Sequence, residues 1–372
     1  MRAPRRAGLV GAAAGLLAAG VAAGVAAQRA VVRRARGVPD PHADEPFGDL
    51  GSDEVRLVRA ADGTDVYVEV VDPSDGVEVE PGFPAAAAAP PPADPTIVFV
   101  HGFCLDMGTF HFQRRTLTRR GAHRMVFYDQ PGHGRSPELE SGPYELSALG
   151  EVLRAVVDDA AGDDGPVVLV GHSMGGMAIM AMAEAHPGLF ARRVAGVVLV
   201  ATSGSLLGGT KIGVPTLVAR FARPLLPLVE RGARATGPLL DQARRAAADL
   251  AYLLTRRYGF GGPHPSPALV SYVERMNSRT TAETVARYLR TLSTHARHPA
   301  LAALRDVPTL VVVGDRDVIT PPEHSEEIVR YLPDARLVTV AGSGHLVMLE
   351  HSDEVDRALL AFLDRVMPGE AR

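Results

Sequence analysis

The chain has 372 residues but only one cysteine and no tryptophan. A single thiol, Cys104, excludes an intrachain disulfide framework and a cysteine-based zinc site. With eight tyrosines and no tryptophan, an aromatic surface for stacking nucleic-acid bases is not expected. No base stands near Cys104 in the sequence, so we interpret it as an unreactive small residue at the border of a pocket.

The chain also lacks an excess of positive charge. Its 39 basic and 43 acidic residues give a net charge of −4 with neutral histidine, so no broad basic surface is available for phosphate backbones. Nucleic acid is therefore not expected as a partner. Hydrophobic residues make up 46% of the chain, enough for a large core, and the length suits one large domain with an insertion.

Residues 1–37 raise the question of a membrane. The stretch 7–27 is uncharged, and at about 1.5 Å per helical residue it is long enough to cross a hydrocarbon core of roughly 30 Å. Arginines flank it on both sides, and Arg29 and Arg33 directly after it favour an uncleaved anchor over an exported segment. We expect a membrane-associated protein with one N-terminal transmembrane helix of undetermined orientation.

Two alternatives to the anchor stay open. The basic start and the small residues Val25-Ala26-Ala27 also fit a cleaved export signal, which would give a secreted protein. The stretch is mostly alanine and glycine, so insertion into a bilayer is only weakly favourable, and a surface-lying or disordered tail is the third interpretation.

An acidic linker and a hairpin follow the N-terminal segment. Residues 38–54 are acidic and punctuated by proline and glycine, which is typical of a linker. Two alternating segments, 55–58 and 66–70, flank Asp62-Gly63, a turn sequence that closes antiparallel hairpins. Residues 72–95 are rich in proline and alanine and predict a low-complexity surface loop.

Beyond this loop the sequence alternates between short apolar runs and amphipathic stretches. Strands buried on both faces have this pattern, and the stretches at 144–161 and 174–185 have the length of crossover helices. We predict an α/β fold with a mostly parallel sheet and helices on both faces. The predicted buried strands are Thr96–Val100, Met125–Tyr128, Val167–Val170, Val194–Val200, Thr309–Val313 and Ala335–Val340.

The alternation stops between residues 203 and 300. This stretch contains helical segments at 239–255 and 281–295 and no convincing buried strand. It predicts a helical cap, or lid, inserted between a first part of the core at 55–202 and a second part at 301–372.

The strongest chemical motif is Gly171-His172-Ser173-Met174-Gly175, which joins a predicted strand to a predicted helix. A G-x-S-x-G sequence in that context is a nucleophile elbow, a turn so sharp that side chains at the flanking glycines would collide with their neighbours. The turn exposes the serine hydroxyl above the sheet edge, where the next helix directs its amides. Ser173 is therefore the candidate nucleophile.

A serine nucleophile needs a base and an acid that orients the base. His345 follows the last predicted strand, and Asp317 follows the strand before it, so both belong to the edge at which open α/β sheets bind ligands. Asp315 competes with Asp317, but it directly follows the strand and we expect it to cap the turn. His351 competes with His345, and we expect it at the surface.

Acyl transfer also needs amide donors for the oxyanion. The residue after the nucleophile supplies one, the amide of Met174, and the loop after the first parallel strand supplies the other, the amide of Phe103. Gly102 allows the backbone to approach closely. We expect His101 to hydrogen-bond within this loop and not to act in catalysis.

Five motifs together make the chain resemble the α/β-hydrolase superfamily over residues 55–202 and 301–372. The resemblance implies an eight-stranded, mostly parallel sheet, the triad Ser173, Asp317 and His345, and a lid formed by 203–300. It also implies that 129–136 is a structural turn in which His133 packs. The motifs are His101-Gly-Phe, Asp129-Gln-Pro-Gly-His-Gly-Arg-Ser136, Gly171-His-Ser-Met-Gly-Gly176, Gly314-Asp-Arg-Asp317 and Gly342-Ser-Gly-His345.

Serine at the elbow argues against the haloalkane dehalogenases and epoxide hydrolases of this superfamily, which use aspartate there. We expect a serine hydrolase that cleaves a small ester or a lipid-like ester through an acyl-enzyme, with no metal and no cofactor. One alternative is a cofactor-free perhydrolase of the haloperoxidase type, in which peroxide replaces water. The other is a non-catalytic homologue that binds a ligand under the lid.

Overall fold

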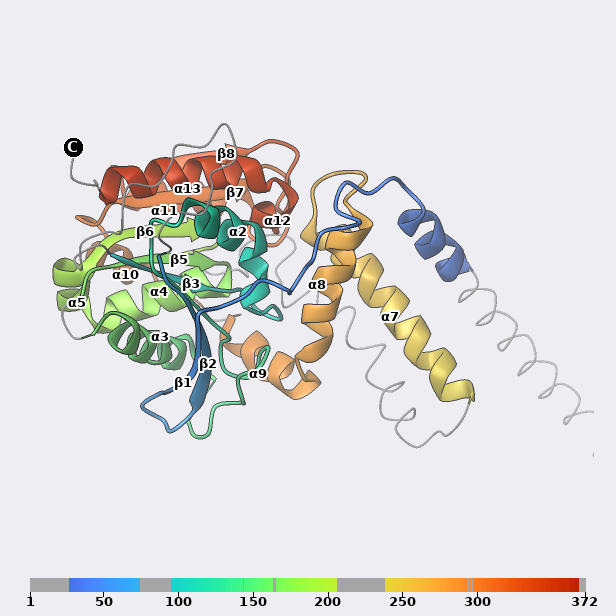
Figure 1. The fold of residues 1–372 in the computed structure, drawn as a ribbon, viewed down its shortest axis with the longest axis horizontal. Coiled ribbons are helices and arrows are strands. Elements are labelled where there is room, and N and C mark those ends of the chain that lie inside the picture. The colour runs from blue at the N-terminus through green and yellow to red at the C-terminus, as the bar shows by residue number, and fades with distance from the viewer. Residues whose placement is uncertain are drawn as a thin grey trace, which may run out of the picture.

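The computed structural model describes residues 27–73, 95–142, 144–162, 165–205, 238–292, 295 and 297–367, without the side chains of 238–247 and 298. One eight-stranded sheet forms the centre of the molecule (Figure 1), with the strand order β1-β2-β4-β3-β5-β6-β7-β8. The first two strands pair antiparallel with their neighbours, and all the other pairs are parallel. The predicted α/β fold is confirmed.

Every predicted strand is present within two residues of its expected bounds. The antiparallel hairpin turns at Gly63, whose φ of 95° suits glycine. The strands are β1 (Glu54–Arg59), β2 (Asp65–Val71), β3 (Thr96–Val100), β4 (Met125–Tyr128), β5 (Val167–His172), β6 (Val194–Val200), β7 (Thr309–Gly314) and β8 (Arg336–Val340).

The central strands are apolar throughout because both of their faces are covered. In β3, Val98 and Val100 join the core on one side of the sheet, while Ile97 and Phe99 join the core on the other. Successive side chains of a strand point to opposite faces, so a continuous apolar run is what a sheet covered on both sides requires.

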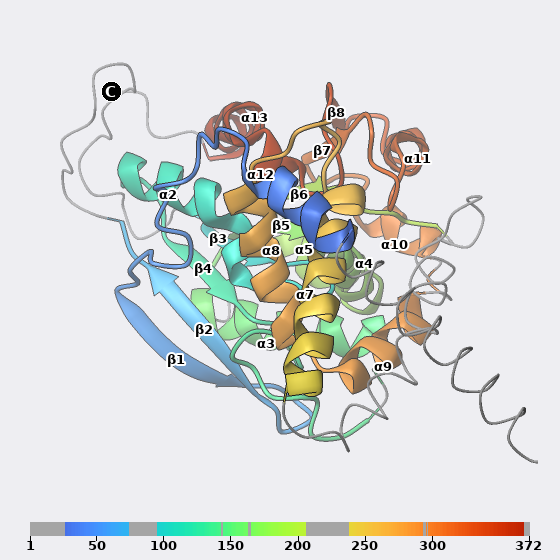
Figure 2. The ribbon, with the colours of Figure 1, turned by 90° about the vertical axis from the view of Figure 1, so that its right-hand side faces the viewer.

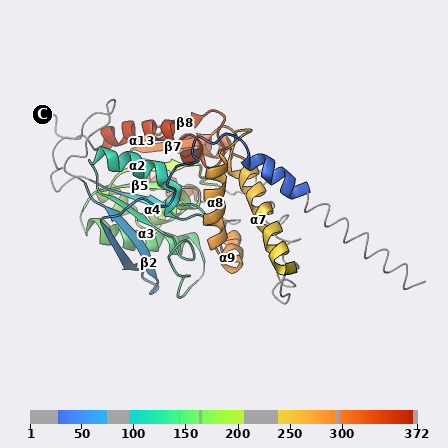
Figure 3. The ribbon, with the colours of Figure 1, turned by 45° about the vertical axis from the view of Figure 1, so that its right-hand side comes forward.

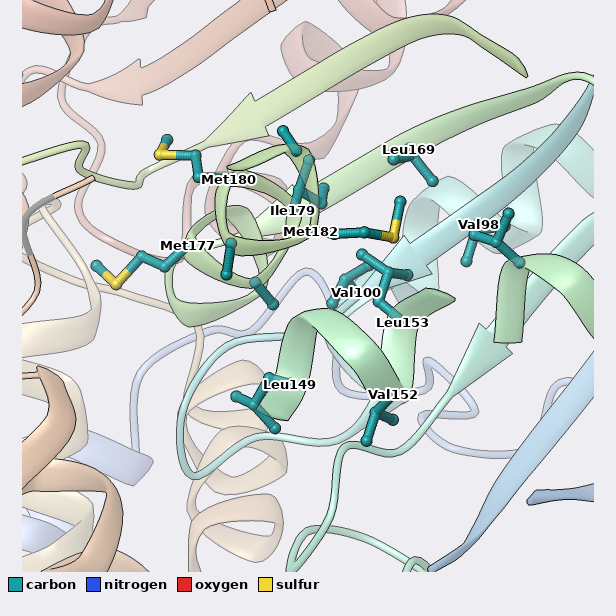
Figure 4. Packing of buried hydrophobic residues seen from close by; sticks show 14 of the residues in the cluster. Val98, Val100, Leu149, Val152, Leu153, Leu169, Met177, Ile179, Met180 and Met182 are labelled. Atoms are coloured by element: carbon teal, nitrogen blue, oxygen red, sulfur yellow. The ribbon is translucent and has the colours of Figure 1, made fainter. Parts of the chain in front are cut away.

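Helices cover both faces of this sheet. The first core lies between the sheet and α3 and α4, and Figure 4 shows Leu153 of α3 beside Val100 of β3. The second core contains residues of α2, α12 and α13. The bounds are α2 (His111–Arg120), preceded by the 3-10 turn η1 (Met107–Phe110), α3 (Leu146–Ala161), α4 (Met174–Ala185), α5 (Pro187–Arg193), α10 (His298–Ala303), α11 (Pro322–Tyr331), α12 (Val347–Glu350) and α13 (Ser352–Val366).

The helices α7 (Pro238–Gly259), α8 (Pro267–Arg279) and α9 (Ala282–Leu292) lie to one side of the sheet, and we call them the cap (Figure 1). Within it, α7 and α8 lie side by side (Figure 3). They fall inside the stretch 203–300, and the part of that stretch from 206 to 237 lies outside the described residues.

The segment before β1 packs against the cap and α2, although its part from residue 38 onward was expected to be a linker. Residues 27–36 are helical and lie beside the cap (Figure 2), and Arg36 stacks on Tyr252 of α7. Asp40 accepts hydrogen bonds from Ser266 Oγ and from the Ala268 amide at the start of α8. Phe47 stacks on Tyr272 with ring centroids 4.6 Å apart. This segment therefore joins the cap to the core.

The expected membrane anchor requires a correction. In the part of the chain that the structure describes, no helix is both long and apolar enough to cross a bilayer. The longest of these helices, α7, carries charged residues such as Asp249, Arg256 and Arg257, which cost about 3 kcal/mol each at the centre of a bilayer. Except for Ala27, the stretch 7–27 lies outside the described residues. The predictions of a transmembrane helix and a membrane localisation are therefore not upheld.

The contact between α3 and α4 predicts a stability effect at Gly150. A Cβ there would lie 2.8 Å from the backbone nitrogen of Met182, and backbone cannot move aside as a flexible side chain does. Gly150→Ala should lower the free energy of unfolding in urea by about 1–3 kcal/mol, in spite of alanine's better helix propensity. Gly51→Ala is the control, because nothing lies within 4 Å of that position. Equal stability of the two variants would contradict the close packing.

Candidate active site

Ser173 occupies a strained turn between β5 and α4. Its backbone has φ 51° and ψ −116°, in a region that residues with a side chain rarely adopt. The end of the neighbouring strand β6 holds the turn: the Ser173 amide donates to the Val200 carbonyl at 2.9 Å, and the Thr202 hydroxyl donates to the Ser173 carbonyl at 2.7 Å. These two hydrogen bonds therefore hold Ser173 in a backbone conformation that local preferences alone would not favour.

The glycines on both sides of this turn leave no room for a side chain. A Cβ at Gly171 would lie 2.7 Å from the amide nitrogen of Gly176, and one at Gly175 would collide with the carbonyl oxygen of Val100. The first contact lets the helix fold back close to the strand, and the second lets α4 begin directly beside the end of β3. Both positions behave as a nucleophile elbow requires.

The loops after β7 and β8 bring Asp317 and His345 together. His345 Nδ1 lies 2.8 Å from Asp317 Oδ2, and both side chains are buried. The same carboxylate accepts hydrogen bonds from the amides of Ile319 at 2.8 Å and Thr320 at 3.0 Å. Because a carboxylate oxygen without a proton only accepts, Nδ1 of His345 donates to Asp317 and carries the ring proton, and Nε2 is left without it.

Sequence reasoning missed Thr320. Its hydroxyl donates to Asp317 Oδ2 at 2.8 Å, and its oxygen lies 3.3 Å from His345 Nδ1, in a position that is 1% exposed. The signal was present in the sequence as a hydroxyl three residues after the aspartate, in the same loop. That spacing lets the Thr320 side chain fold back onto the Asp317 carboxylate. A hydroxyl three residues after an aspartate is, however, too common in sequences to identify a site.

The two rival residues make other contacts. Asp315 accepts a hydrogen bond from the Gly342 amide at 2.7 Å and so joins the loops after β7 and β8. His351 pairs with Glu354 at 3.2 Å near the start of α13, and both side chains reach solvent. Neither contacts the pair formed by His345 and Asp317.

His101 orients the loop that carries Phe103. The Gln130 amide donates to Nε2 of His101 at 2.8 Å, so Nδ1 carries the ring proton and donates to the Gly102 carbonyl at 2.8 Å. Burial lowers the pKa of His101 to about 3, which keeps the ring neutral. A trans peptide points its C=O and N–H in opposite directions, so this bond turns the Phe103 amide away from His101.

His172 links three parts of the site. Its Nε2 donates to the His345 carbonyl at 3.1 Å, and the two rings lie with centroids 4.8 Å apart. A Cβ at Gly102 would lie 2.6 Å from His172 Nδ1 and 3.2 Å from Ser173 Cβ. His172, the residue before Ser173, therefore contacts the loop of His345 and the loop of Phe103, and burial holds the pKa of His172 well below the usual value.

The structure thus gathers the five expected residues, Ser173, Met174, Phe103, Asp317 and His345, at one edge of the sheet. Among the described residues, the Ser173 hydroxyl is not hydrogen-bonded to His345. Both residues are 7% exposed. Hydrogen bonds between catalytic groups are often long without substrate and shorten when it binds.

The other candidate groups are structural or inert. Asp129 accepts hydrogen bonds from the amides of Met107 at 2.9 Å and Arg135 at 2.8 Å, which joins the loops after β3 and β4. Burial, with Asp106 nearby, raises the pKa of Asp129 to about 7.

Burial raises the pKa of the Cys104 thiol to about 12, so the thiol stays protonated at neutral pH. The described residues contain no group of three or more metal-ligating side chains.

Comparisons with known proteins agree with the fold. A sequence model of the alpha/beta hydrolase family matches residues 97–358. The chain is 27% identical to the mouse sn-1-specific diacylglycerol lipase ABHD11, over 72% of this chain and 81% of that protein. It is 30% identical over 311 residues to the polyketide synthase ThaQ of Burkholderia thailandensis, covering 81% of this chain but only 13% of the synthase.

A solved structure has the same fold. The thermophilic esterase of Thermogutta terrifontis superposes with a TM-score of 0.59 at 23% identity, covering 84% of this chain and 99% of the esterase. At 23% identity, this similarity shows a shared fold and nothing more.

The buried imidazole of His133 predicts a pH dependence of stability. Burial lowers its pKa to about 4 in the folded chain, whereas an unfolded histidine titrates near 6.5. The unfolded chain therefore takes up this proton first, so the stabilisation is fully present above about pH 6.5 and is lost as the pH falls toward 4. When the pH is lowered from 6.5 to 5, the unfolding free energy of the His133→Gln variant should therefore fall by about 1–2 kcal/mol less than that of the wild type. If urea titrations give the same loss of unfolding free energy for the variant and the wild type over this pH range, the prediction is contradicted.

Proposed function

The chain belongs to the alpha/beta hydrolase family, and from this premise we propose that it is a serine hydrolase that cleaves carboxylic esters through an acyl-enzyme. One observation carries the proposal. The buried contact of 2.8 Å between His345 and Asp317 lies at the sheet edge at which Ser173 has a left-handed backbone. A base, an orienting acid and a serine hydroxyl at one edge are what acyl transfer needs.

The first step is attack by Ser173 on the ester carbonyl. His345 Nε2 takes the proton from the hydroxyl as Oγ bonds to the carbonyl carbon, which becomes tetrahedral. The protonated imidazole then gives this proton to the leaving alcohol as the ester bond breaks. Water, activated in turn by His345, attacks the acyl-enzyme and releases the carboxylic acid and free Ser173.

The charge that develops on the carbonyl oxygen needs donors that are already in place. The Met174 amide is the first of α4, where amides have no acceptor within the helix and where the helix dipole favours negative charge. The Phe103 amide is turned away from His101 by the bond to the Gly102 carbonyl. We propose that these two amides form the oxyanion hole.

Asp317 and Thr320 prepare the base in this proposal. The carboxylate holds the tautomer of His345 that leaves Nε2 unprotonated, and it stabilises the imidazolium that forms during attack. The Thr320 hydroxyl and the amides of Ile319 and Thr320 fix the carboxylate, so that it cannot rotate away from the ring. The arrangement needs no metal and no cofactor.

The proposed substrate is a small or lipid-like ester. The name of the mouse relative, a diacylglycerol lipase, supports the lipid-like class. The wider family leaves the acyl group open, and the segment 206–237, which lies within the stretch we propose as the lid, falls outside the described residues. An activity profile across p-nitrophenyl esters of increasing acyl length will define the preference.

Removing the nucleophile tests the proposal directly. Ser173→Ala should lower hydrolysis of p-nitrophenyl butyrate by at least about 10³-fold and abolish labelling by a fluorophosphonate probe, while the thermal unfolding curve stays cooperative. Activity within a few-fold of the wild type would refute the role of Ser173. A wild-type chain that neither labels nor hydrolyses would favour the non-catalytic ligand-binding alternative.

The two neighbouring aspartates supply a matched pair for the role of the acid. Asp317→Asn should lower kcat by about 10⁴-fold, because the amide favours the wrong tautomer of His345. Asp315→Asn should stay within about twofold of the wild type, because Asp315 contacts the Gly342 amide and not the imidazole. Steady-state kinetics of the two variants decide the assignment, and the reverse order of effects would exchange the two residues.

A further inference from the structure

Glu350, at the end of α12, lies outside the proposed triad but accepts hydrogen bonds from two separate loops. Its Oε1 accepts the amides of Gly262 at 2.7 Å and Gly261 at 3.0 Å. Its Oε2 accepts the amides of Gly344 at 2.7 Å and Gly261 at 2.9 Å, and the Ser343 hydroxyl at 3.3 Å. One carboxylate thus satisfies the amides of three glycines.

The two loops belong to different parts of the fold. Gly261 and Gly262 lie in the turn between α7 and α8 of the cap, which reaches α12 in Figure 1. Ser343 and Gly344 immediately precede His345. Glu350 therefore connects the cap to the loop that carries the proposed base.

The backbones of these loops are in direct contact. A Cβ at Gly344 would lie 2.6 Å from the Gly261 nitrogen, and one at Gly261 would lie 2.6 Å from the Gly344 nitrogen. The Leu346 amide also donates to the Gly259 carbonyl at 2.9 Å. Only glycine allows this approach, and amides so enclosed need an acceptor from the protein, because leaving one unpaired costs about 1–3 kcal/mol.

Arg316 ties the loop after β7 to the same place. Its amide donates to the Ser343 carbonyl at 2.9 Å, and its guanidinium donates to the Gly261 carbonyl at 3.2 Å. Arg316 is the neighbour of Asp317, so the loops of the acid and the base both rest on the turn that Glu350 holds.

We propose that Glu350 is a positioning residue that clamps the cap turn 260–262 to the Ser343–His345 loop and thereby fixes the imidazole for attack. The inference rests on the proposed function, because it assigns Glu350 a role through His345. The clamp is one of several attachments of the cap among the described residues: Asp40 and the hydrogen bond from Tyr272 to the Gly108 carbonyl also attach α8. Loss of Glu350 therefore frees the histidine loop more than it frees the cap.

Kinetics and amide exchange test the clamp together. Glu350→Ala should lower kcat for p-nitrophenyl butyrate about 10- to 100-fold with KM within about threefold, since a displacement of about 1 Å has effects of that size. The amides of Gly261, Gly262 and Gly344 should exchange with solvent at least about tenfold faster. Glu350→Gln should fall between alanine and the wild type in both measurements, because its side chain keeps one acceptor oxygen.

Glu354→Gln is the matched control. Glu354 lies one helical turn farther on, reaches solvent and pairs with His351, so kcat and glycine exchange should stay within about twofold of the wild type. A folded Glu350→Ala chain with wild-type kcat or unchanged glycine exchange overturns the inference. If that variant does not fold, Glu350→Gln decides by the same two criteria.

Failure of the proposed function gives a different result. In that case the wild type and Glu354→Gln neither hydrolyse esters nor react with the fluorophosphonate probe, and the positioning role of Glu350 is rejected together with the proposed function. An active wild type beside an unaffected Glu350→Ala rejects only the positioning role.

Discussion

Close approach of backbones at the carboxyl edge of the sheet is the constraint on which the site depends. Gly175 brings α4 against the end of β3, Gly102 brings the following loop against Ser173, and Gly314 brings the end of β7 against the loop of His345. A Cβ at any of these positions would overlap a neighbouring atom, so the loops would have to move apart. The convergence of residues far apart in the sequence is therefore a consequence of where the glycines stand.

Burial then decides the protonation states around the site. His101 and His133 are enclosed without a carboxylate, so desolvation lowers their pKa values and keeps both rings neutral. Neutral rings donate from one nitrogen and accept at the other, which lets His101 join the Gln130 amide to the Gly102 carbonyl. His345, by contrast, has a carboxylate partner in Asp317. The buried imidazoles thus divide into neutral rings that hold loops in place and one ring that is paired with a carboxylate.

The cap is tied into this framework from two sides. The segment before β1 attaches α8 through Asp40 and Phe47, and Glu350 attaches the turn between α7 and α8 to the loop of His345. A segment of acidic composition, which by itself is typical of a linker, becomes a packed element because its carboxylates find helix amides and arginines. Composition does not contain that information, since Arg115 lies 70 residues from its partner Glu45, and Ser266 lies 226 residues from its partner Asp40.

The sequence by itself determined the order of strands along the chain, the elbow at Ser173 and the order of serine, aspartate and histidine, because these follow from local periodicity and turn chemistry. It misled on the membrane, because an uncharged stretch is compatible with an anchor without requiring one. The positions of the two aspartates after the strand already favoured Asp317 over Asp315, and the structure has Asp317 in contact with His345. Only the tertiary structure decided that Thr320 supports the carboxylate and that Glu350 joins two loops. Those choices depend on side-chain directions at loops brought together by the sheet, and no spacing along the chain encodes them.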